Sequence, residues 1–520
     1  MRRIWLLLPL LSIGVACATP GHWADTRSEV IDPIHALLHH TYPESYETMD
    51  PAELQASFTD AEAAAPSLAL LATFGQIERG NGYIESVDLE AQPVTARVRL
   101  RVEGVDADGK PRSVRQEKRF ELARGPDGWR IARDLSDPYV VVPAPSAHFF
   151  DETPLRGLWF RHEGKDKRDL QGQPRRYVYG SGIAATDLDG DGWDDLILAT
   201  GERIEVYANE EGRFRYASED LGLGKALPSN GSRIWNVVVP ADFDNDGYVD
   251  LFVGAEFGQP LLLRGSAEGF RAVTDSGLET SERTISATVA DFDGDGRLDL
   301  YLANHEDEFR EAPNPPWSKN AHADQLYRNE GGLRFRDVTE EAGLGNRGWS
   351  LTPVAADYDG DGDVDLFVGN DFGFDVLYQN DGAGRFSEVS DDVGLDRPVA
   401  SMGADWGDYD GDGDLDLFVG GMSSNAGWVL EAPDFKIRKV PGFVDWMFRP
   451  YVREYVRAWF RGNRFYENQG DGTFREIARE KGVDAHGWSW ATVWLDFDND
   501  GHLDLYALNG FITGALEDDL

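Results

Sequence analysis

The sequence predicts a mainly β protein: a β-propeller of six to seven four-stranded blades, preceded by a small α+β domain. Three observations lead to this prediction. A nonapeptide of pattern D-x-D-x-D-G-x-x-D recurs six times between residues 187 and 504. Short apolar segments with the length and composition of β-strands flank the copies. Residues 24–142 lack the repeat and have patterns typical of two helices (28–40 and 51–74) followed by four strands.

The strands of each repeat can be assigned from the segments around the nonapeptide. Segments such as NVVVPAD and ATVWLD precede it, and segments such as DLFVG and DLYLAN follow it. A third strand is indicated by EVYAN, QLYRN, VLYQN and RFYEN, and a fourth by GRFRYAS, LRFRDV and GTFREI. Four short strands repeated about every 50 residues are typical of a propeller blade.

The nonapeptide has the chemistry of a cation loop. Positions 1, 3, 5 and 9 are Asp and position 6 is Gly in all copies. A hard dication such as Ca²⁺ prefers six to eight oxygen ligands, and alternate residues of a tight loop can turn their carboxylates to one centre. An EF-hand is excluded, because position 12 is apolar in every copy rather than Glu or Asp. We therefore expect up to six structural Ca²⁺ ions rather than a set of solvated acidic turns.

Position 7 varies in residue type, as expected where only its carbonyl oxygen is a ligand. The predicted ligands are Asp187, Asp189, Asp191, Trp193 and Asp195; Asp242, Asp244, Asp246, Tyr248 and Asp250; Asp291, Asp293, Asp295, Arg297 and Asp299; Asp357, Asp359, Asp361, Asp363 and Asp365; Asp408, Asp410, Asp412, Asp414 and Asp416; and Asp496, Asp498, Asp500, His502 and Asp504.

These loops resemble FG-GAP/VCBS repeats, the blades of integrin alpha-subunit propellers. The stretch from RGNRFYENQGDGTF to GHLDLYALNGFITG is similar to the cartilage acidic protein family and its bacterial relatives. The resemblance covers residues 147–520 and implies a calcium-binding propeller with a role in binding or adhesion.

Two features concern the outline of the ring. Residues 149–158 match the fourth strand and Gly-Leu pair at 335–344, so we expect the ring to close with a strand supplied from before the first repeat. Insertions are expected at 306–324 and 421–462. The second contains a basic, aromatic amphipathic helix, which would lie either on an anionic membrane surface or against a blade edge.

The N-terminal domain at 24–142 has helices first and then strands ending in GWRIAR. This order resembles nuclear-transport-factor-two-like (SnoaL-like) domains, which implies a cone that binds a small molecule or mediates contacts.

Residues 1–18 have the pattern of a secretory signal peptide: Arg2 and Arg3 precede an apolar run too short to span a bilayer as a helix. Cys17, the only cysteine, resembles the acylated residue of bacterial lipoproteins, whereas Ala16-Cys17-Ala18 also fits cleavage and release. Both alternatives predict an exported protein, either lipid-anchored in the cell envelope or free in the periplasm or outside the cell.

A candidate ligand face lies in the loops that connect each fourth strand to the next first strand. Each of these loops carries Arg or His, which is notable in a chain of net charge −43. The alternative is that the Trp side chains pack the blades and the Arg side chains pair with Asp. The candidate residues are Arg176, Tyr179, Arg233, Trp235, Arg283, Arg347, Trp349, Arg397, His486 and Trp488.

The excess of 93 acidic over 50 basic residues argues against nucleic-acid binding. Nucleophile-elbow, zinc-protease, P-loop and dinucleotide motifs are absent from the sequence, which predicts a non-enzyme. We expect an exported, calcium-stabilised module for protein or carbohydrate binding and adhesion at the cell envelope. Two alternatives are a polysaccharide lyase or hydrolase that uses the axial pocket, and an envelope assembly factor.

Overall fold

The computed structural model describes residues 33–143, 156–158, 167–168, 174–175, 182–305, 318–422, 459 and 461–509. Short gaps within these ranges fall at 35, 89–90, 127, 137–139, 202, 228–234, 256–258, 279–282, 396–398 and 485–487. The predicted signal peptide with Cys17 and most of both insertions lie outside the described residues. In the described part of the chain, no helix has the length and apolarity needed to cross a membrane. The chain divides into two compact units, which are taken separately below.

The N-terminal unit is the small α+β region that the sequence predicts. Its helices are η1 (Ala36–Thr41), α2 (Tyr42–Glu44), α3 (Pro51–Ala56) and α4 (Ala61–Leu71). Its strands are β1 (Gln76–Asp88), β2 (Val94–Val105), β3 (Pro111–Gly125), β4 (Gly128–Asp134) and β5 (Val140–Pro143). The sheet is antiparallel, with order β1-β2-β3-β4 and with β5 on the free part of β3.

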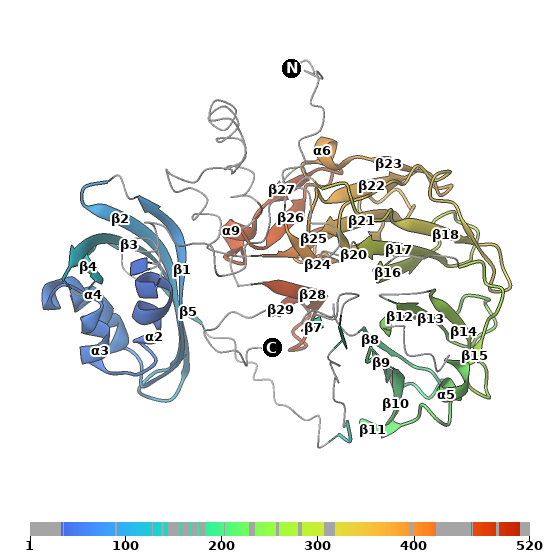
Figure 1. Ribbon diagram of the computed structural model, residues 1–520, viewed down its shortest axis with the longest axis horizontal. Coiled ribbons are helices and arrows are strands. Elements are labelled where there is room, and N and C mark those ends of the chain that lie inside the picture. Colours follow the sequence, from blue (N-terminus) through green and yellow to red (C-terminus); the bar gives the residue numbers. More distant parts are fainter. Residues whose placement is uncertain are drawn as a thin grey trace, which may run out of the picture. The chain divides into compact units, whose positions relative to one another are not determined.

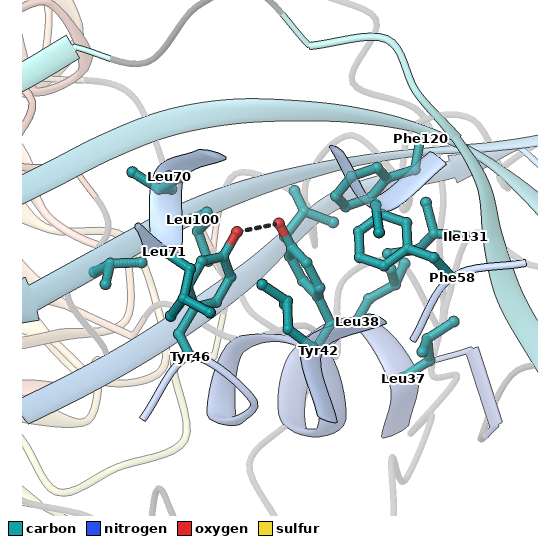
Figure 2. Close-up of a cluster of buried hydrophobic side chains, with 14 of the residues drawn as sticks. Leu37, Leu38, Tyr42, Tyr46, Phe58, Leu70, Leu71, Leu100, Phe120 and Ile131 are labelled. Atoms are coloured by element: carbon teal, nitrogen blue, oxygen red, sulfur yellow. Dashed lines mark hydrogen bonds between the residues drawn. The ribbon is translucent and has the colours of Figure 1, made fainter. Parts of the chain in front are cut away.

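Two helices stand where the sequence predicted one over 51–74. Asp60 is the reason, because its Oδ1 accepts a hydrogen bond of 2.9 Å from Ala63 N and so caps a new helix start. Asp50 caps α3 in the same way through Ala52 N. The helices bury Tyr42 and Tyr46 against the sheet in an apolar core, where their hydroxyls lie 3.1 Å apart (Figure 2).

The second unit consists of antiparallel sheets with one repeated strand order. We number them as blades 1 to 6. Blade 1 holds β8 (Ile183–Thr186), β9 (Asp195–Ala199), β10 (Ile204–Glu210) and β11 (Arg213–Tyr216); blade 2 holds β12 (Trp235–Ala241), β13 (Asp250–Ala255), β14 (Leu261–Arg264) and β15 (Arg271–Ala272). Blade 3 holds β16 (Arg283–Ala290), β17 (Asp299–His305), β18 (Gln325–Asn329) and β19 (Phe335–Asp337); blade 4 holds β20 (Ser350–Ala356), β21 (Asp365–Asn370), β22 (Val376–Asn380) and β23 (Phe386–Glu388). Blade 5 holds β24 (Ser401–Gly407), β25 (Asp416–Gly421), β26 (Arg464–Asn468) and β27 (Phe474–Glu476), and blade 6 shows β28 (Ser489–Leu495) and β29 (Asp504–Asn509).

Short elements connect these sheets. They are α5 (Leu223–Ala226), α6 (Ser390–Val393) and α9 (Ala478–Lys481); the strand pair β6 (Lys167–Arg168) and β7 (Pro174–Arg175) precedes blade 1. The first strands lie near the middle of the unit and the later strands lie further out (Figure 1). The second strands of blades 2 to 5 are buried along their whole length, which explains their continuous apolar runs. The predicted fold, a mainly β propeller of four-stranded blades, is confirmed.

A recurring backbone hydrogen bond joins neighbouring blades. In blades 2 to 4, the Phe at the fourth strand donates its N–H to the carbonyl that precedes a Gly-Leu pair of the previous repeat. The pairs are Phe270 to Leu221 (2.8 Å), Phe335 to Ser276 (2.7 Å) and Phe386 to Ala342 (2.8 Å). Phe214 of blade 1 donates in the same way to Arg156 (2.7 Å), which precedes Gly157 and Leu158. Residues 156–158 therefore contact the fourth strand of blade 1 in the same way as the end of one repeat contacts the fourth strand of the following blade.

If the ring closes as predicted, the chain that enters blade 1 must contact the fourth strand of that blade, as residues 156–158 do. The predicted closing strand at 149–153 itself lies outside the described residues.

Candidate metal centres

Each acidic nonapeptide forms the tight connection between the first and second strands of a blade. Its first carboxylate shapes the loop: Asp242 Oδ1 accepts from Asp246 N at 3.0 Å, and Asp242 Oδ2 accepts from Gly247 N at 2.9 Å. The same two bonds recur in the other five loops. The loop is thus held in place by side chain–backbone bonds within the chain.

Two loop positions need the left-handed backbone region. Position 6, always Gly, has φ between +85° and +97°. Position 4 also has positive φ, from +56° at Asn245 to +78° at Gly190. Gly and Asn adopt this region most readily, which explains why the loops contain either DGDG or DNDG.

The Asp at position 9 is buried and ties the loop to the third strand. Asp299 is 2% exposed; its Oδ2 accepts from Phe292 N at 3.3 Å and its Oδ1 from Asn329 N at 2.8 Å. Burial raises the pKa of Asp299 to about 7, and the hydrogen bond from Asn329 N acts in the opposite direction. Asp365 has the equivalent bonds from Tyr358 N and Asn380 N. The Asp at position 9 therefore holds the loop against the third strand through its two hydrogen bonds.

Carboxylate oxygens converge in the loops of blades 1 to 5. In blades 2, 3 and 4, oxygens from positions 1, 3 and 5 all lie within 4.8 Å of one another. In blades 1 and 5, the grouped oxygens come from positions 1, 3 and 9. Three predicted ligands are thus brought together in each of these five loops, and the grouped set includes position 9 only in blades 1 and 5.

Two carboxylate oxygens in these clusters are buried without a hydrogen-bond partner among the residues that the structure describes. They are Oδ1 of Asp244 and Oδ1 of Asp293, whose side chains are 10% and 14% exposed. A buried carboxylate oxygen that lacks a donor is costly unless a cation satisfies it. An all-oxygen, carboxylate-rich donor set suits a hard divalent cation such as Ca²⁺, so the residues present fit the predicted ion.

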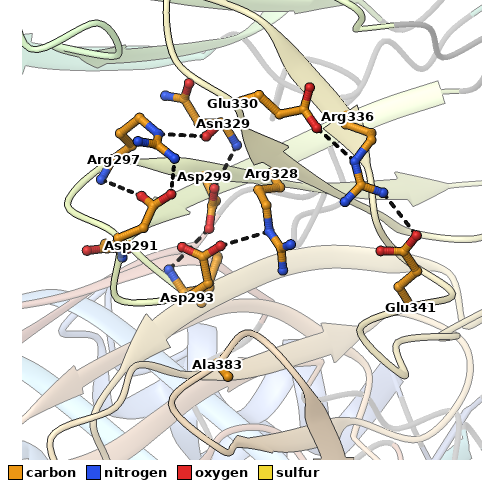
Figure 3. Close-up of polar contacts among 12 residues, drawn as sticks. Asp291, Asp293, Arg297, Asp299, Arg328, Asn329, Glu330, Arg336, Glu341 and Ala383 are labelled. Atoms are coloured by element: carbon orange, nitrogen blue, oxygen red, sulfur yellow. Dashed lines mark hydrogen bonds and ion pairs between the residues drawn. The ribbon is translucent and has the colours of Figure 1, made fainter.

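Position 7 plays different parts in different blades. Trp193 and Tyr248 are exposed, whereas Arg297 pairs with Asp295 and donates through Nε to the carbonyl of Asn329 at 2.9 Å (Figure 3). Asp363 and Asp414 add a fifth carboxylate to the loops of blades 4 and 5. Ligation by the carbonyl oxygen of position 7 stays a prediction.

The third strands contribute an Asn that sequence analysis did not single out. Asn329 Nδ2 donates to the carbonyl oxygens of Phe243 in blade 2 (2.8 Å) and of Leu298 in its own blade (3.0 Å). Asn468 bonds Tyr358 and Leu415 in the same manner. The signal was present in the sequence, because the third-strand segments EVYAN, QLYRN, VLYQN and RFYEN all end in Asn.

The candidate ligand face is described for half of its residues. Arg347 is exposed and Trp488 is half-buried. Trp235, Arg283 and Trp349 are 2%, 6% and 0% exposed. Trp235 lies in a hydrophobic core cluster and Trp349 packs on His305 and Phe372, which favours the alternative for the Trp side chains. Pairing of Arg283 with an Asp stays a prediction. Arg176, Tyr179, Arg233, Arg397 and His486 lie outside the described residues.

Comparisons with known proteins agree with this architecture. The FG-GAP-like repeat family matches residues 187–253, 242–302, 317–368, 357–419 and 455–507. The chain is 24% identical over 400 residues to cartilage acidic protein 1 of Homo sapiens, a match that covers 66% of this chain and 58% of that protein. It is 30% identical over 173 residues to human integrin alpha-IIb, covering 28% and 17%.

The chain thus spans less than two thirds of the length of these curated relatives. Among solved structures, a lectin of Agrocybe aegerita that recognises terminal N-acetylglucosamine superposes with a TM-score of 0.38 at 17% identity, covering 64% of this chain and 75% of that one. The matched repeats together cover more than half of the sequence, and the chain belongs to the FG-GAP-like repeat family.

Proposed function

We propose that this protein is a calcium-stabilised propeller that acts as an exported adhesion or recognition module for a protein or carbohydrate ligand. The observation that carries the proposal is the repeated carboxylate cluster, in which Asp244 Oδ1 and Asp293 Oδ1 are buried and no described residue donates to them. Relatedness to integrin alpha-IIb and to cartilage acidic protein 1 supports a binding role over catalysis.

Calcium has a structural role in this proposal. A cation that binds the folded loops and not the unfolded chain stabilises the fold in proportion to the logarithm of its concentration over its dissociation constant. It also relieves repulsion among carboxylates that lie within 4.8 Å of one another. The blades then form a rigid support for surface loops, among which Arg347 is an exposed candidate for ligand contact.

Location follows from the N-terminus in this proposal. Residues 1–18 direct export, and acylation at Cys17 anchors the mature protein in the envelope. Metabolic labelling with a fatty acid, compared between the natural chain and Cys17→Ser, tests the anchor; unlabelled natural protein found free outside the membrane fraction favours cleavage and release.

Calcium titration of the metal-stripped protein tests the cation part of the proposal. We expect saturable binding by calorimetry and a rise in Tm that EGTA reverses. Asp244→Asn and Asp293→Asn should each weaken one site, because each keeps the side-chain shape and removes a charge. Asp275→Asn is the matched control, since this carboxylate lies outside the loops with its side chain 77% exposed. A protein that binds no calcium, or a Tm that EGTA leaves unchanged, would contradict the proposal.

Ligand binding is tested separately with glycan arrays and a panel of extracellular matrix proteins, in calcium and in EGTA. We expect a ligand that is retained in calcium and weakened by Arg347→Glu. A ligand that binds equally well to the chelated, destabilised protein would contradict the supporting role of calcium.

A further inference from the structure

One third-strand position lies beside the strand that follows the acidic loop in successive blades, and its residue type varies among the blades. The strand register fixes the equivalence: the residue before it pairs with the Leu that follows the Asp at position 9. We call it the tuning position. Its residues in blades 1 to 5 are Ala208, Arg264, Arg328, Gln379 and Glu467.

In blades 2 and 3 the tuning position places a guanidinium group on the loop carboxylates. Arg264 Nη2 lies 2.9 Å from Asp244 Oδ2 and 2.8 Å from Asp246 Oδ2. Arg328 Nε lies 2.8 Å from Asp293 Oδ2 (Figure 3). In each case the arginine pairs with Oδ2 of the position-3 Asp, while Oδ1 of the same carboxylate is buried without a donor from the described part of the chain.

Blade 4 has a neutral side chain at the same position. Gln379 Nε2 donates to Asp359 Oδ2 at 2.5 Å, so an amide replaces the guanidinium on an equivalent oxygen. The loop also has a fifth carboxylate, Asp363, at position 7. Among the described ion pairs, none joins an arginine or lysine to this loop.

Blade 5 differs again. Its tuning residue Glu467 accepts from the OH of Tyr409, the second residue of the same loop, at 2.8 Å and pairs with Arg475 at 2.8 Å. The loop of blade 5 thus retains five aspartates, including Asp414, without a cationic tuning residue.

We propose that the tuning position divides the calcium sites into two classes, with weak sites in blades 2 and 3 and tight sites in blades 4 and 5. This inference rests on the proposed binding of calcium. A guanidinium group cannot lose its proton, so Arg264 and Arg328 are permanent cations that compete with Ca²⁺ for the position-3 carboxylate. Blade 3 is the extreme case, because Arg297 holds Asp295 as well.

The consequence is a graded response to calcium. Sites in blades 4 and 5 fill first and hold the ring together, because repulsion among five aspartates favours the ion most strongly. Sites in blades 2 and 3 fill only at higher calcium, when the arginine gives up its carboxylate. The arginines meanwhile limit repulsion in the two loops that lack an ion at low calcium.

Exchanging residues between blades tests the inference in the full-length, metal-stripped protein. Arg328→Gln places the blade 4 residue in blade 3, and Gln379→Arg does the reverse. By calorimetry, we expect Arg328→Gln to tighten one weak site about tenfold and Gln379→Arg to loosen one tight site by a similar factor. Arg264→Gln provides a second, independent variant of the first kind.

Arg271→Gln is the matched control, because this arginine also lies in blade 2, is 77% exposed and pairs with Glu268 away from the loop. Hydrogen exchange of the segments 242–250, 291–299 and 357–365 during the titration assigns each affinity to a loop. Suppose that the natural protein binds calcium and that the three substitutions at the tuning position change no calcium affinity by more than the Arg271→Gln control does. The inference is then wrong, while the proposed function stands. If the natural protein binds no calcium, both fail together.

Discussion

The side-chain amide of Asn380 donates a hydrogen bond of 2.8 Å to the backbone carbonyl oxygen of Phe292, which lies 88 residues earlier in the neighbouring blade. The same amide donates to the carbonyl of Val364 at 2.9 Å. Phe292 belongs to the acidic loop of blade 3 and Val364 to that of blade 4, so one buried side chain links two candidate cation loops.

Asn380→Ala should therefore destabilise the propeller by about 1–3 kcal/mol, because two buried carbonyl groups lose their donor. Denaturant unfolding in saturating calcium measures this loss. Gln469→Ala is the control, since the exposed Gln469 amide bonds only within its own turn. A loss no larger than that of the control would show that the bond between blades contributes little.

The sequence sufficed to predict the propeller and its loops, because both are specified by residues that lie close together in the chain. The nonapeptide repeats within a few residues, and the strands beside it are short apolar runs. Asn380 shows where such reasoning stops: its partner is distant in the chain, so its role appears only when the blades are placed side by side. The tuning position could not be recognised from the sequence for the same reason, because only the strand register shows that Arg264 and Gln379 are equivalent.

Burial was the property least accessible from the sequence. Arg283 begins β16 and Trp349 directly precedes β20, both next to polar residues in the sequence, yet they are buried in the folded blades. In the N-terminal unit, Lys118 occurs in the charged segment VRQEKRFELAR, where alternation alone does not show which charge faces inward. Its inward position depends on Asp134 of β4 and on Ser67 of α4, which hydrogen-bond its Nζ.

Lys118→Met should destabilise the N-terminal unit by about 3–5 kcal/mol, because it leaves a buried carboxylate without its partner. Lys118 Nζ lies 2.8 Å from Asp134 Oδ2, and both side chains are 0% exposed. Burial lowers the pKa of Lys118, while Asp134 acts against this shift. Unfolding followed by a probe in this unit, such as hydrogen exchange of 94–105, measures the loss.

Two further variants separate charge from packing at Lys118. Adding Asp134→Asn to Lys118→Met should recover part of the stability, since the side chain buried at position 134 is then neutral. Arg97→Met removes an exposed pair of the same sheet, 3.9 Å from Glu117, and should change stability by at most about 1 kcal/mol. Equal losses in Lys118→Met and Arg97→Met would contradict a special role for the buried pair.

Asp375 should make the stability of the propeller fall as pH rises from 3.8 to about 7. Burial raises the pKa of Asp375 from 3.8 to about 7, against the hydrogen bonds from Asn370 N and Ser401 Oγ. The folded state therefore binds a proton that the unfolded chain releases in this range, and stability is lost on the order of 1.4 kcal/mol per pH unit.

Asp375→Asn removes this contribution; its amide oxygen can still accept from Asn370 N, and its Nδ2 can donate to Ser401 Oγ in place of the bond that Asp375 accepts. The unfolding free energy of Asp375→Asn minus that of the natural protein should thus increase with pH between 4 and 7, and the difference cancels titration of the loop carboxylates. Asp275→Asn, at an exposed position, should give a nearly flat difference. A flat difference for Asp375→Asn as well would mean that this carboxyl is ionised throughout the range.

Gly157 provides a test of ring closure. Its φ is +88°, and a Cβ at this position would lie 2.5 Å from the carbonyl oxygen of Phe214 in blade 1. Gly157→Ala should therefore cost about 1–3 kcal/mol through backbone strain and through loss of the Phe214–Arg156 hydrogen bond. Gly224→Ala in α5 is the control, since a Cβ there meets nothing within 4 Å.

The location of the damage distinguishes ring closure from a local contact. If residues 149–158 complete blade 6 and then dock on blade 1, Gly157→Ala should speed hydrogen exchange in both 213–216 and 489–495. Gly343→Ala, which disturbs the equivalent contact with Phe386, should instead affect the neighbouring blades 3 and 4. Faster exchange in 213–216 with unchanged protection of 489–495 would show that the segment only covers blade 1, and the ring would then have to close by other residues.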